Sequence, residues 1–339
     1  MPRFTLGLRI PVVLGATSLM LLSGCLSAPD ETSDLCNPGD LTEIMDGLAG
    51  GGELLGGDAN AELIQQMLES PTDGPIYMVN LIRYRELAEY ADGRETDLTG
   101  REANALYAPA EFLAAIGARV VFSADVDMQI DGDDTVWEEV DIVEYPCVTA
   151  FLSMLADPEF QARAIHKDAG VEKTIVMVTD LEPSQFPVGL LSSDTPYPAT
   201  EEDPAFELIH VKDYHEIAQY EDGADEPERT GEEAWQMYQS NGAAAGGGIG
   251  SYPTAVLRVR GVLQGDDRTW DEVQIVHMPS MAGFEALLDN ETRQEGRYHR
   301  YAALANNYSL ITYPTVLDIP SDSDSVFGAL LGLLFGLGN

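Results

Sequence analysis

Polar side chains recur at matching positions in two stretches of the chain that are otherwise apolar. His166 and His299 lie 133 residues apart, and Tyr107 and Tyr238 lie 131 apart. Histidine suits proton transfer near neutral pH, and Asn or Tyr can stabilise a developing oxyanion. We therefore take His166, Asn80 and Tyr107 as candidate catalytic residues. The candidate pocket residues are Tyr84, Trp137, Glu139, His210, Tyr214, Tyr238, Trp270, Glu272 and His299.

A structural role is the alternative for each of these residues. A repeated helical His is often a satisfied structural residue, and a repeated Trp is more often core than a ligand platform. Repetition within one chain indicates common origin and shared packing, but it does not indicate activity. If His166 is catalytic, we expect it to face a closed pocket together with Asn80 or Tyr107.

Several sequence signals of metal and nucleotide chemistry are missing. The sequence contains no CxxC, HExxH, GxxxxGK or GxSxG pattern. The DGDD and SDSDS strings lack the Gly and the terminal Glu of a calcium loop, so they are better interpreted as turns. We therefore expect no metal and no cofactor.

Three strings recur in the same order along the chain. LAEYADG at 87–93 returns as IAQYEDG at 217–223, TGREANALY at 99–107 as TGEEAWQMY at 230–238, and GDDTVWEEVDIVEYP at 132–146 as GDDRTWDEVQIVHMP at 265–279. Conserved order at a nearly constant offset indicates an internal repeat. The pattern predicts two units, at 75–181 and 205–316, joined by a Pro- and acid-rich linker at 182–204.

Each unit has the same expected order of elements. In the first, IYMVNLIRY predicts a strand, and Thr99 with Glu102 three residues later predicts a capped helix start. Val126, Met128 and Ile130 alternate with polar residues and predict the apolar face of a second strand. A hairpin, a second helix and a final strand at KTIVMVT complete an α+β unit of βαββαβ order, which is the ferredoxin-like arrangement.

A unit of this kind leaves one face of its sheet bare, because both helices lie on the other face. Two tandem copies can bury these bare faces against each other. We therefore expect two ferredoxin-like units packed sheet to sheet as an intramolecular α/β barrel.

The strings DGPIYMVNLIRY, TGREANALY and WEEVDIVEYP, the last followed by FLSMLADPEFQARAIHKDAG, resemble the family called domain of unknown function 1330. That family belongs to the dimeric α/β-barrel superfamily. The resemblance covers both units, about two-thirds of the chain, but the second departs from it at LDNETRQEG and NGAAAGGGIG. It implies the fold and no particular reaction, since the superfamily contains cofactor-free oxygenases, isomerases, haem enzymes and non-enzymatic units.

The first 25 residues are typical of a bacterial lipoprotein signal. Arg3 and Arg9 precede a short apolar run at 10–22, and Leu22-Ser23-Gly24-Cys25 resembles a lipobox. We expect cleavage after 1–24, lipidation of Cys25, and a tether at 25–74 that holds the protein on the extracytoplasmic side of a membrane in the bacterial cell envelope. The alternative is an ordinary cleaved signal with a chance Cys.

The chain is strongly acidic, with 58 Asp and Glu against 18 Lys and Arg and a net charge of −40. Such a chain repels phosphate backbones, so we expect no nucleic-acid partner. The acids are spread along the sequence, which favours solubility or adaptation to salt over a dedicated surface for cations.

Two cysteines remain after lipidation, Cys36 and Cys147. They form a disulfide between the tether and the first unit, or they are two unrelated thiols; the sequence leaves both open. The tail at 317–339 ends in 14 apolar, Gly-spaced residues, too few to span a bilayer. It packs within the protein or lies on the membrane.

Three functions fit these observations. The first is a membrane-anchored module that binds a small apolar ligand or acts as a scaffold. The second is a cofactor-independent oxygenase or isomerase acting on a small apolar or aromatic compound, with His166 as proton shuttle. The third is a purely structural envelope lipoprotein.

Overall fold

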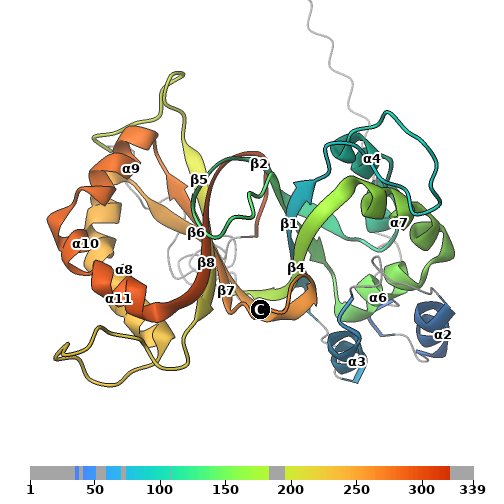
Figure 1. Ribbon diagram of the computed structural model, residues 1–339, viewed down its shortest axis with the longest axis horizontal. Helices are drawn as coiled ribbons and strands as arrows, with labels where there is room; N and C mark the ends of the chain where they lie inside the picture. The colour runs from blue at the N-terminus through green and yellow to red at the C-terminus, as the bar shows by residue number, and fades with distance from the viewer. Residues whose placement is uncertain are drawn as a thin grey trace, which may run out of the picture. The chain divides into compact units, whose positions relative to one another are not determined.

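The computed structural model describes residues 35–37, 41–50, 59–69, 74–107, 109–182 and 195–320 (Figure 1). All of them belong to one compact unit that spans 32–339. The predicted signal peptide, the lipidation site Cys25, most of the linker and the tail from 321 lie outside the described residues. Those expectations stay predictions.

Eight antiparallel strands form one closed barrel, in the order β1-β3-β2-β8-β5-β7-β6-β4. The predicted barrel is thus confirmed as a closed eight-stranded antiparallel barrel within a mixed α/β fold. The strands are β1 (Ile76–Tyr84), β2 (Arg119–Asp131), β3 (Glu139–Tyr145), β4 (Val171–Leu181), β5 (Phe206–Tyr214), β6 (Tyr252–Gln264), β7 (Glu272–Met278) and β8 (Leu304–Leu317).

The barrel closes through edge-to-edge pairing of its two halves. The first half, β1–β4, ends in β2 and β4; the second, β5–β8, ends in β8 and β6. β2 pairs with β8 from Phe122–Leu317 to Asp131–Ser309, and β4 pairs with β6 from Val176–Gln264 to Leu181–Leu257. The bare faces that the sequence predicts are therefore buried, and hydrogen bonds join the sheets as well.

Alternate residues of each strand fill the barrel interior. Tyr77, Val79 and Leu81 of β1 belong to one buried cluster with Ile209 and Val211 of β5. The residues between them turn to the opposite face of the sheet, as the two-residue period of a strand requires. That outer face carries the candidate site.

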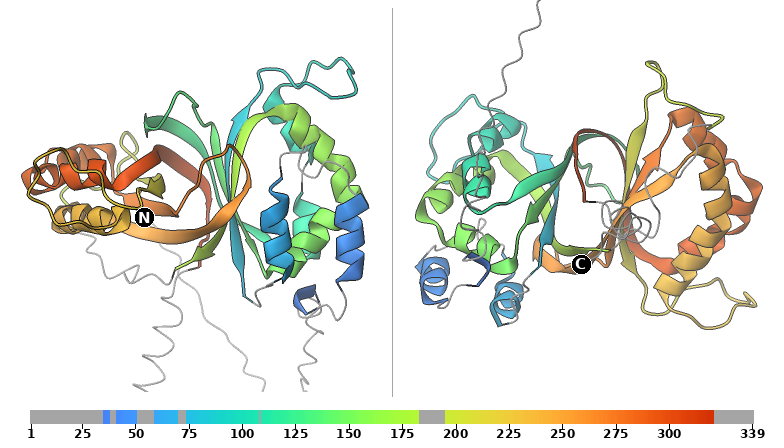
Figure 2. Two further views of the ribbon diagram at one scale, coloured as in Figure 1. Left: turned by 60° about the horizontal axis from the view of Figure 1, so that its bottom comes forward. Right: turned by 180° about the vertical axis from the view of Figure 1, so that it is seen from behind.

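Helices cover the outer face of both halves, on opposite sides of the barrel (Figures 1 and 2). Those of the first half are α4 (Gly100–Tyr107), α5 (Ala110–Ala115), α6 (Val148–Ala156) and α7 (Pro158–Gly170). Those of the second are α8 (Gly231–Ile249), α9 (Met281–Leu288), α10 (Glu291–Glu295) and α11 (Arg297–Ala303). In the part of the chain that the structure describes, no helix combines the length and apolarity needed to cross a bilayer.

The segment expected to be a tether is partly folded onto the first half. It contains α2 (Thr42–Gly50) and α3 (Ala61–Glu69), whose buried residues Ile44, Leu48 and Leu63 join the same apolar cluster as α6. The Asn60 amide donates to the Val262 carbonyl of β6 at 3.1 Å. The segment therefore contacts both halves of the barrel.

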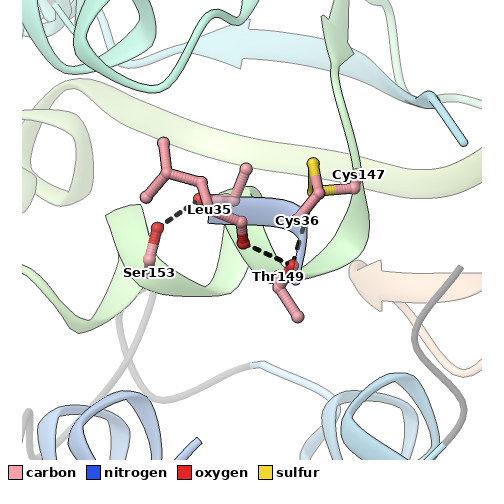
Figure 3. The surroundings of a disulfide bond; sticks show 6 residues. Leu35, Cys36, Cys147, Thr149 and Ser153 are labelled. Carbon is pink, nitrogen blue, oxygen red and sulfur yellow. Dashed lines mark hydrogen bonds between the residues drawn. A yellow bond between two sulfur atoms is a disulfide. The ribbon is translucent and has the colours of Figure 1, made fainter. Parts of the chain in front are cut away.

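A disulfide between Cys36 and Cys147 fastens this segment to the start of α6 (Figure 3). The two Cα atoms are 5.7 Å apart, and Cys147 is fully buried. Beside it the Thr149 hydroxyl donates to the Leu35 carbonyl at 2.7 Å. Of the two alternatives that the sequence leaves open, the structure contains the bridge.

The far end of β2 differs from the sequence expectation. Met128 and Ile130 were expected on the buried face, but their side chains are 49% and 43% exposed. The register of β2 against β8 shifts between Val126 and Met128, and such a bulge re-aims the side chains that follow it. The Gln129 amide bonds instead to the backbone of the adjacent turn, at Thr135 O, 3.0 Å away.

Candidate ligand-binding site

A cavity of about 1030 Å³ lies in the second half, between the outer face of the sheet and the helices. Leu208 and His210 of β5 and Gln274 and Val276 of β7 line its sheet side. These residues share one face because each strand contributes every second side chain. The walls thus combine apolar side chains with a few polar ones.

On the face of α8 that lines the cavity, the residues become smaller toward the C-terminal end of the helix. Trp235 and Tyr238 come first and are followed, at helical spacing, by Gly242, Ala243 and Gly246. A Thr230–Glu233 capping box starts the helix, and Gly250 ends it in the left-handed conformation at φ 88°. The bare C-terminal part leaves the space open.

Larger side chains fill the matching space of the first half. Phe160 packs edge-on against Tyr107 and Phe112, each with ring centroids 5.5 Å apart, and Tyr145 packs on Phe151 at 4.9 Å. At the sequence offsets of the repeat, Phe112, Tyr145 and Phe160 correspond to Ala243, Met278 and Arg293. Of these three replacements, Ala243 is the one that removes most of a side chain beside the cavity.

The first half contributes part of the cavity wall. Ile130 and Asp131 reach it from the bulged end of β2, and Glu182 follows β4. Asp131 pairs with Arg300 of α11 at 2.5 Å. The closed barrel is therefore needed to complete the site.

A buried ion pair lies beneath the cavity. The Lys212 ammonium bonds to the Glu272 carboxylate and, at 3.1 Å, to the Gln274 side-chain oxygen. It also lies 4.4 Å from the centre of the Trp235 ring. Burial lowers the pKa of Lys212 to about 8, although Glu272 acts in the opposite direction.

His210 lines the cavity as a neutral ring. Its Nδ1 lies 3.0 Å from the Ser309 hydroxyl. Burial holds its pKa well below the ordinary value, and the positive charges of Lys212, Arg300 and Arg293 lower it further. An uncharged imidazole can donate one hydrogen bond and accept another.

The repeated histidines hold loops to helices instead of lining this cavity. His166 Nδ1 lies 2.7 Å from the Tyr90 hydroxyl, and His299 Nδ1 lies 2.7 Å from the Tyr220 hydroxyl. Each pair joins the last helix of its half to the loop after the first strand. The same contact in both halves is the signature of a structural role.

The three catalytic candidates have separate partners. The Asn80 amide donates to the Met78 carbonyl at 3.2 Å, Tyr107 packs on Phe160, and His166 bonds to Tyr90. Among the described residues no hydrogen bond joins any two of Asn80, Tyr107 and His166. Their joint role in a pocket stays a prediction.

In the first half, a cluster of carboxylates lies at positions that correspond to the cavity of the second half. The Tyr84 hydroxyl donates to Glu139 at 3.0 Å, and Arg101 pairs with the same carboxylate. Burial, with the Asp141 charge adding, raises the pKa of Glu139 to about 7. Burial also raises the pKa of Asp141.

The two candidate tryptophans lie inside the barrel. Trp137 and Trp270 pack on Tyr308 with ring centroids 5.7 and 5.4 Å apart. Trp137 also borders a second cavity of about 790 Å³, whose lining includes Arg85, Lys173 and Arg268. Of the proposed pocket residues, His210, Tyr214, Tyr238 and Glu272 line the large cavity.

Sequence reasoning missed Lys212, Trp235 and the arginines of the cavity. Lys212 is one of only three lysines and interrupts an apolar strand, which is a usable signal. Arg293, Arg297 and Arg300 stand close together in an acidic chain, which is another. Over the described residues, no group of three or more His, Cys, Asp or Glu side chains is arranged to hold a metal ion.

Comparison with known proteins gives a relative of appreciable identity. Two solved structures of a Rhodopseudomonas palustris protein of unknown function are 36% and 33% identical to this chain. They cover 38% and 37% of it and 96% and 97% of that protein, with TM-scores of 0.35 and 0.34. The chain belongs to the same family as that protein. Its description names no activity, so the kinship assigns none.

More distant structures align over most of the chain. An anthrone oxidase-like protein is 12% identical over 73% of this chain and 94% of its own, with a TM-score of 0.41. A chlorite dismutase from Candidatus Nitrospira defluvii is 13% identical over 75% and 95%, with a TM-score of 0.38. No family model and no curated protein matches the chain. Likenesses this weak assign no activity.

Proposed function

We propose that this protein binds a small apolar ligand in the cavity of its second half. The observation that carries the proposal is the size and lining of that cavity, about 1030 Å³ between α8 and the sheet. Sites for small molecules are concave, mostly apolar spaces of roughly 300–1,000 Å³ with a few placed polar groups. The lining fits that description, with Leu208, Val276 and Phe284 beside His210 and Gln274.

The absence of three rings that pack the first half supports binding over a scaffold role. Apolar side chains that line an open space give up the burial and the packing contacts that would otherwise stabilise the fold. A purely structural barrel gains from filling the space, as the first half does with Phe112, Tyr145 and Phe160. A ligand offsets that cost.

Binding is tested with N-phenyl-1-naphthylamine, an uncharged probe that fluoresces in apolar surroundings. Gly246 lines the cavity, and a Cβ added there meets no atom closer than 4.0 Å. Gly246→Leu should therefore fold and place its side chain in the ligand space, so we expect weaker probe binding by fluorescence titration. Gly248→Leu is the matched control, since Gly248 is exposed on the same helix with nothing within 4 Å.

Two results contradict the proposal. One is no saturable binding of the probe to the parent protein. The other is equal binding by the Gly246→Leu and Gly248→Leu variants, which would place the probe elsewhere. Mass spectrometry of compounds retained from a metabolite mixture then identifies the natural ligand.

The site belongs, in this proposal, to a lipoprotein anchored at the extracytoplasmic side of a bacterial membrane. The lipobox-like Leu22–Cys25 string supports the anchor. Cys25→Ser should leave the precursor unlipidated and move the protein out of the membrane fraction. An unchanged membrane fraction would remove the anchor from the proposal and leave the ligand site untouched.

We further propose that the barrel consists of two ferredoxin-like units of common origin, related to the domain of unknown function 1330 family. Matching register supports this: Ile76 faces Tyr145 in the first half, and Phe206 faces Met278 in the second, at offsets of 130 and 133. The outer faces of both sheets carry the helices.

The alternative function is a cofactor-independent oxygenase or isomerase. Its candidate proton shuttle in the structure is His210, whereas the sequence suggested His166. His210 is the histidine that lines the cavity, with Ser309 as its hydrogen-bond partner. A proton shuttle on a bound apolar compound would use this neutral ring. Turnover abolished by His210→Gln with ligand binding retained is the expected signature of that alternative.

A further inference from the structure

The charges around the cavity of the second half are distributed unevenly. Arg258, Arg293, Arg297 and Arg300 all line it. Three of these four lie within eight residues, in a chain with a net charge of −40. Whether each arginine already has a carboxylate partner decides what the cavity can attract.

Arg258 is fully compensated. Its guanidinium pairs with Glu182 and Glu232 at 2.7 Å each and with Glu272 at 3.1 Å. Three carboxylates around one guanidinium leave no capacity for an additional anion. This end of the cavity is structural.

The opposite end is under-compensated. Arg300 pairs with Asp131, and Arg297 bonds to the Tyr301 hydroxyl at 2.5 Å. Arg293 lies 5.5 Å from the centre of the Tyr238 ring. Within the described part of the chain neither Arg293 nor Arg297 forms an ion pair, and Asp289 is an exposed residue of the lining.

Arg293 is also held in an environment that disfavours its own charge. Burial lowers the pKa of this guanidinium, and the nearby charges of Arg297 and Arg300 lower it further, against the opposite effect of Tyr238. The group stays protonated, since an arginine loses its proton only at extreme pH. A half-buried cation beside like charges is stabilised by an anion that binds among them.

The first half has no arginine at the positions that match Arg293 and Arg297. Phe160 stands where the second half has Arg293, and Ala164 stands where it has Arg297. The strand position of Asp141 in the first half is occupied by the neutral Gln274 in the second. At these three positions the second half has two more positive charges and one fewer negative charge than the first.

We propose that the cavity selects an amphipathic oxyanion, a carboxylate or sulfonate on an aromatic or aliphatic body, whose anionic group is bound by Arg293. The body of the ligand lies against the bare face of α8 and the apolar floor at Leu208 and Val276. This inference rests on the proposed ligand-binding function and adds the chemical class of the ligand. The planar guanidinium donates paired hydrogen bonds to such an oxyanion, and these are stronger than hydrogen bonds between neutral groups.

Two probes with one aromatic skeleton separate the charge from the apolar body. 8-Anilinonaphthalene-1-sulfonate differs from N-phenyl-1-naphthylamine by its sulfonate. Both are titrated by fluorescence into the purified protein and into Arg293→Met, which keeps an apolar stem against Tyr238. Arg163→Met on α7 is the control, because it removes a partly exposed arginine, paired with Glu111, far from the cavity lining and changes the net charge equally.

The sulfonate should bind the parent protein more tightly than the uncharged probe. Arg293→Met should weaken sulfonate binding about tenfold, or about 1.4 kcal/mol, and leave the uncharged probe unaffected. Arg163→Met should change neither. Added NaCl should weaken sulfonate binding and spare the uncharged probe.

The anion preference is overturned if the uncharged probe binds in a Gly246-dependent manner but Arg293→Met does not weaken the sulfonate. Equal weakening by Arg163→Met also overturns it, because the attraction would then be one of overall charge. Loss of Gly246 dependence for both probes is a different result, and it refutes the proposed binding function itself.

Discussion

Lys212 and Glu272 form a buried ion pair, and removing one partner should not cost the same stability as removing the other. Glu272 contacts two cations, Lys212 and Arg258, whereas Glu272 is the one carboxylate that pairs with Lys212 in the described structure. A buried charge that loses its partner retains the desolvation cost without the Coulombic gain. The carboxylate is therefore the more critical half of the pair.

We expect Glu272→Gln to lower the free energy of unfolding by about 3 kcal/mol, because Lys212 stays buried without an opposite charge. Lys212→Met should cost less, since Arg258 still neutralises Glu272 and the methionine packs on Trp235. Urea unfolding of both variants measures the difference. Equal destabilisation would show that Arg258 does not compensate Glu272.

Glu139 makes stability depend on pH in the opposite sense to an ordinary ion-paired acid. Its pKa is raised to about 7 in the folded chain, above the ordinary value of 4.5. The folded state therefore keeps a proton that the unfolded state releases between these values, so this group lowers the free energy of unfolding as pH rises through that window.

Glu139→Gln removes this dependence. Relative to the parent, the variant should gain about 1–3 kcal/mol between pH 5 and pH 8, at about 1.4 kcal/mol for each pKa unit and allowing for solvent near the carboxylate. Unfolding at the two pH values measures it. Glu285→Gln, at an exposed site on α9, is the control and should show no such gain.

Individual residue positions were partly predictable. His210, Tyr238 and Glu272 were found from polar residues repeated in apolar strands and helices, and they do line the cavity. His166 and His299 follow the same pattern but bind loop tyrosines. A periodic pattern identifies which face of a helix is turned inward, but it does not reveal which neighbour that face meets.

At the scale of elements, α8 combines a strong start with a weak end. Its N-terminus has a complete capping box, whereas its last turns contain Gly246, Gly247 and Gly248. Glycine in a helix interior costs roughly 0.5–1 kcal/mol relative to alanine, because the unfolded chain loses more freedom. The open ligand space thus coincides with a locally marginal helix.

The double variant Gly247→Ala/Gly248→Ala should therefore raise the free energy of unfolding by about 1–2 kcal/mol. A Cβ meets nothing within 4 Å at either position. Thermal or urea unfolding measures the gain, and Gly231→Ala provides the contrast. A Cβ at Gly231 would lie 2.5 Å from the carbonyl oxygens of Ala303 and His215, so that variant should lose stability.

Element types were predictable from period and caps, but the course of β2 was not. Val126, Met128 and Ile130 alternate as a buried strand face would, yet two of them are exposed. The bulge arises from pairing with β8, about 180 residues away in sequence. Register against so distant a partner leaves no local pattern in the sequence.

At the scale of the molecule, the disulfide joins residues 111 positions apart. A cross-link that closes so long a loop restricts the unfolded chain strongly. We expect the Cys36→Ser/Cys147→Ser double variant to be less stable than the oxidised parent by about 2–5 kcal/mol. Unfolding followed by circular dichroism measures this. A parent protein that unfolds identically with and without a reductant would contradict it.

The closed barrel was predictable because each unit was expected to have one bare sheet face, which a tandem copy can cover. Tyr77 and Ile209 do meet in one interior cluster. The cavity was not predictable, because it depends on differences between the halves, such as Phe160 and Arg293, whose effect appears only once the helices are placed.

The pairing of β2 with β8 and of β4 with β6 also determines how the protein behaves among its neighbours. Each half alone would expose two unpaired strand edges, which are templates for pairing with other chains. In the intact barrel each half protects the edges of the other. If the two halves separated, each would expose its unpaired strand edges. We would then expect the protein to associate with other chains or to aggregate.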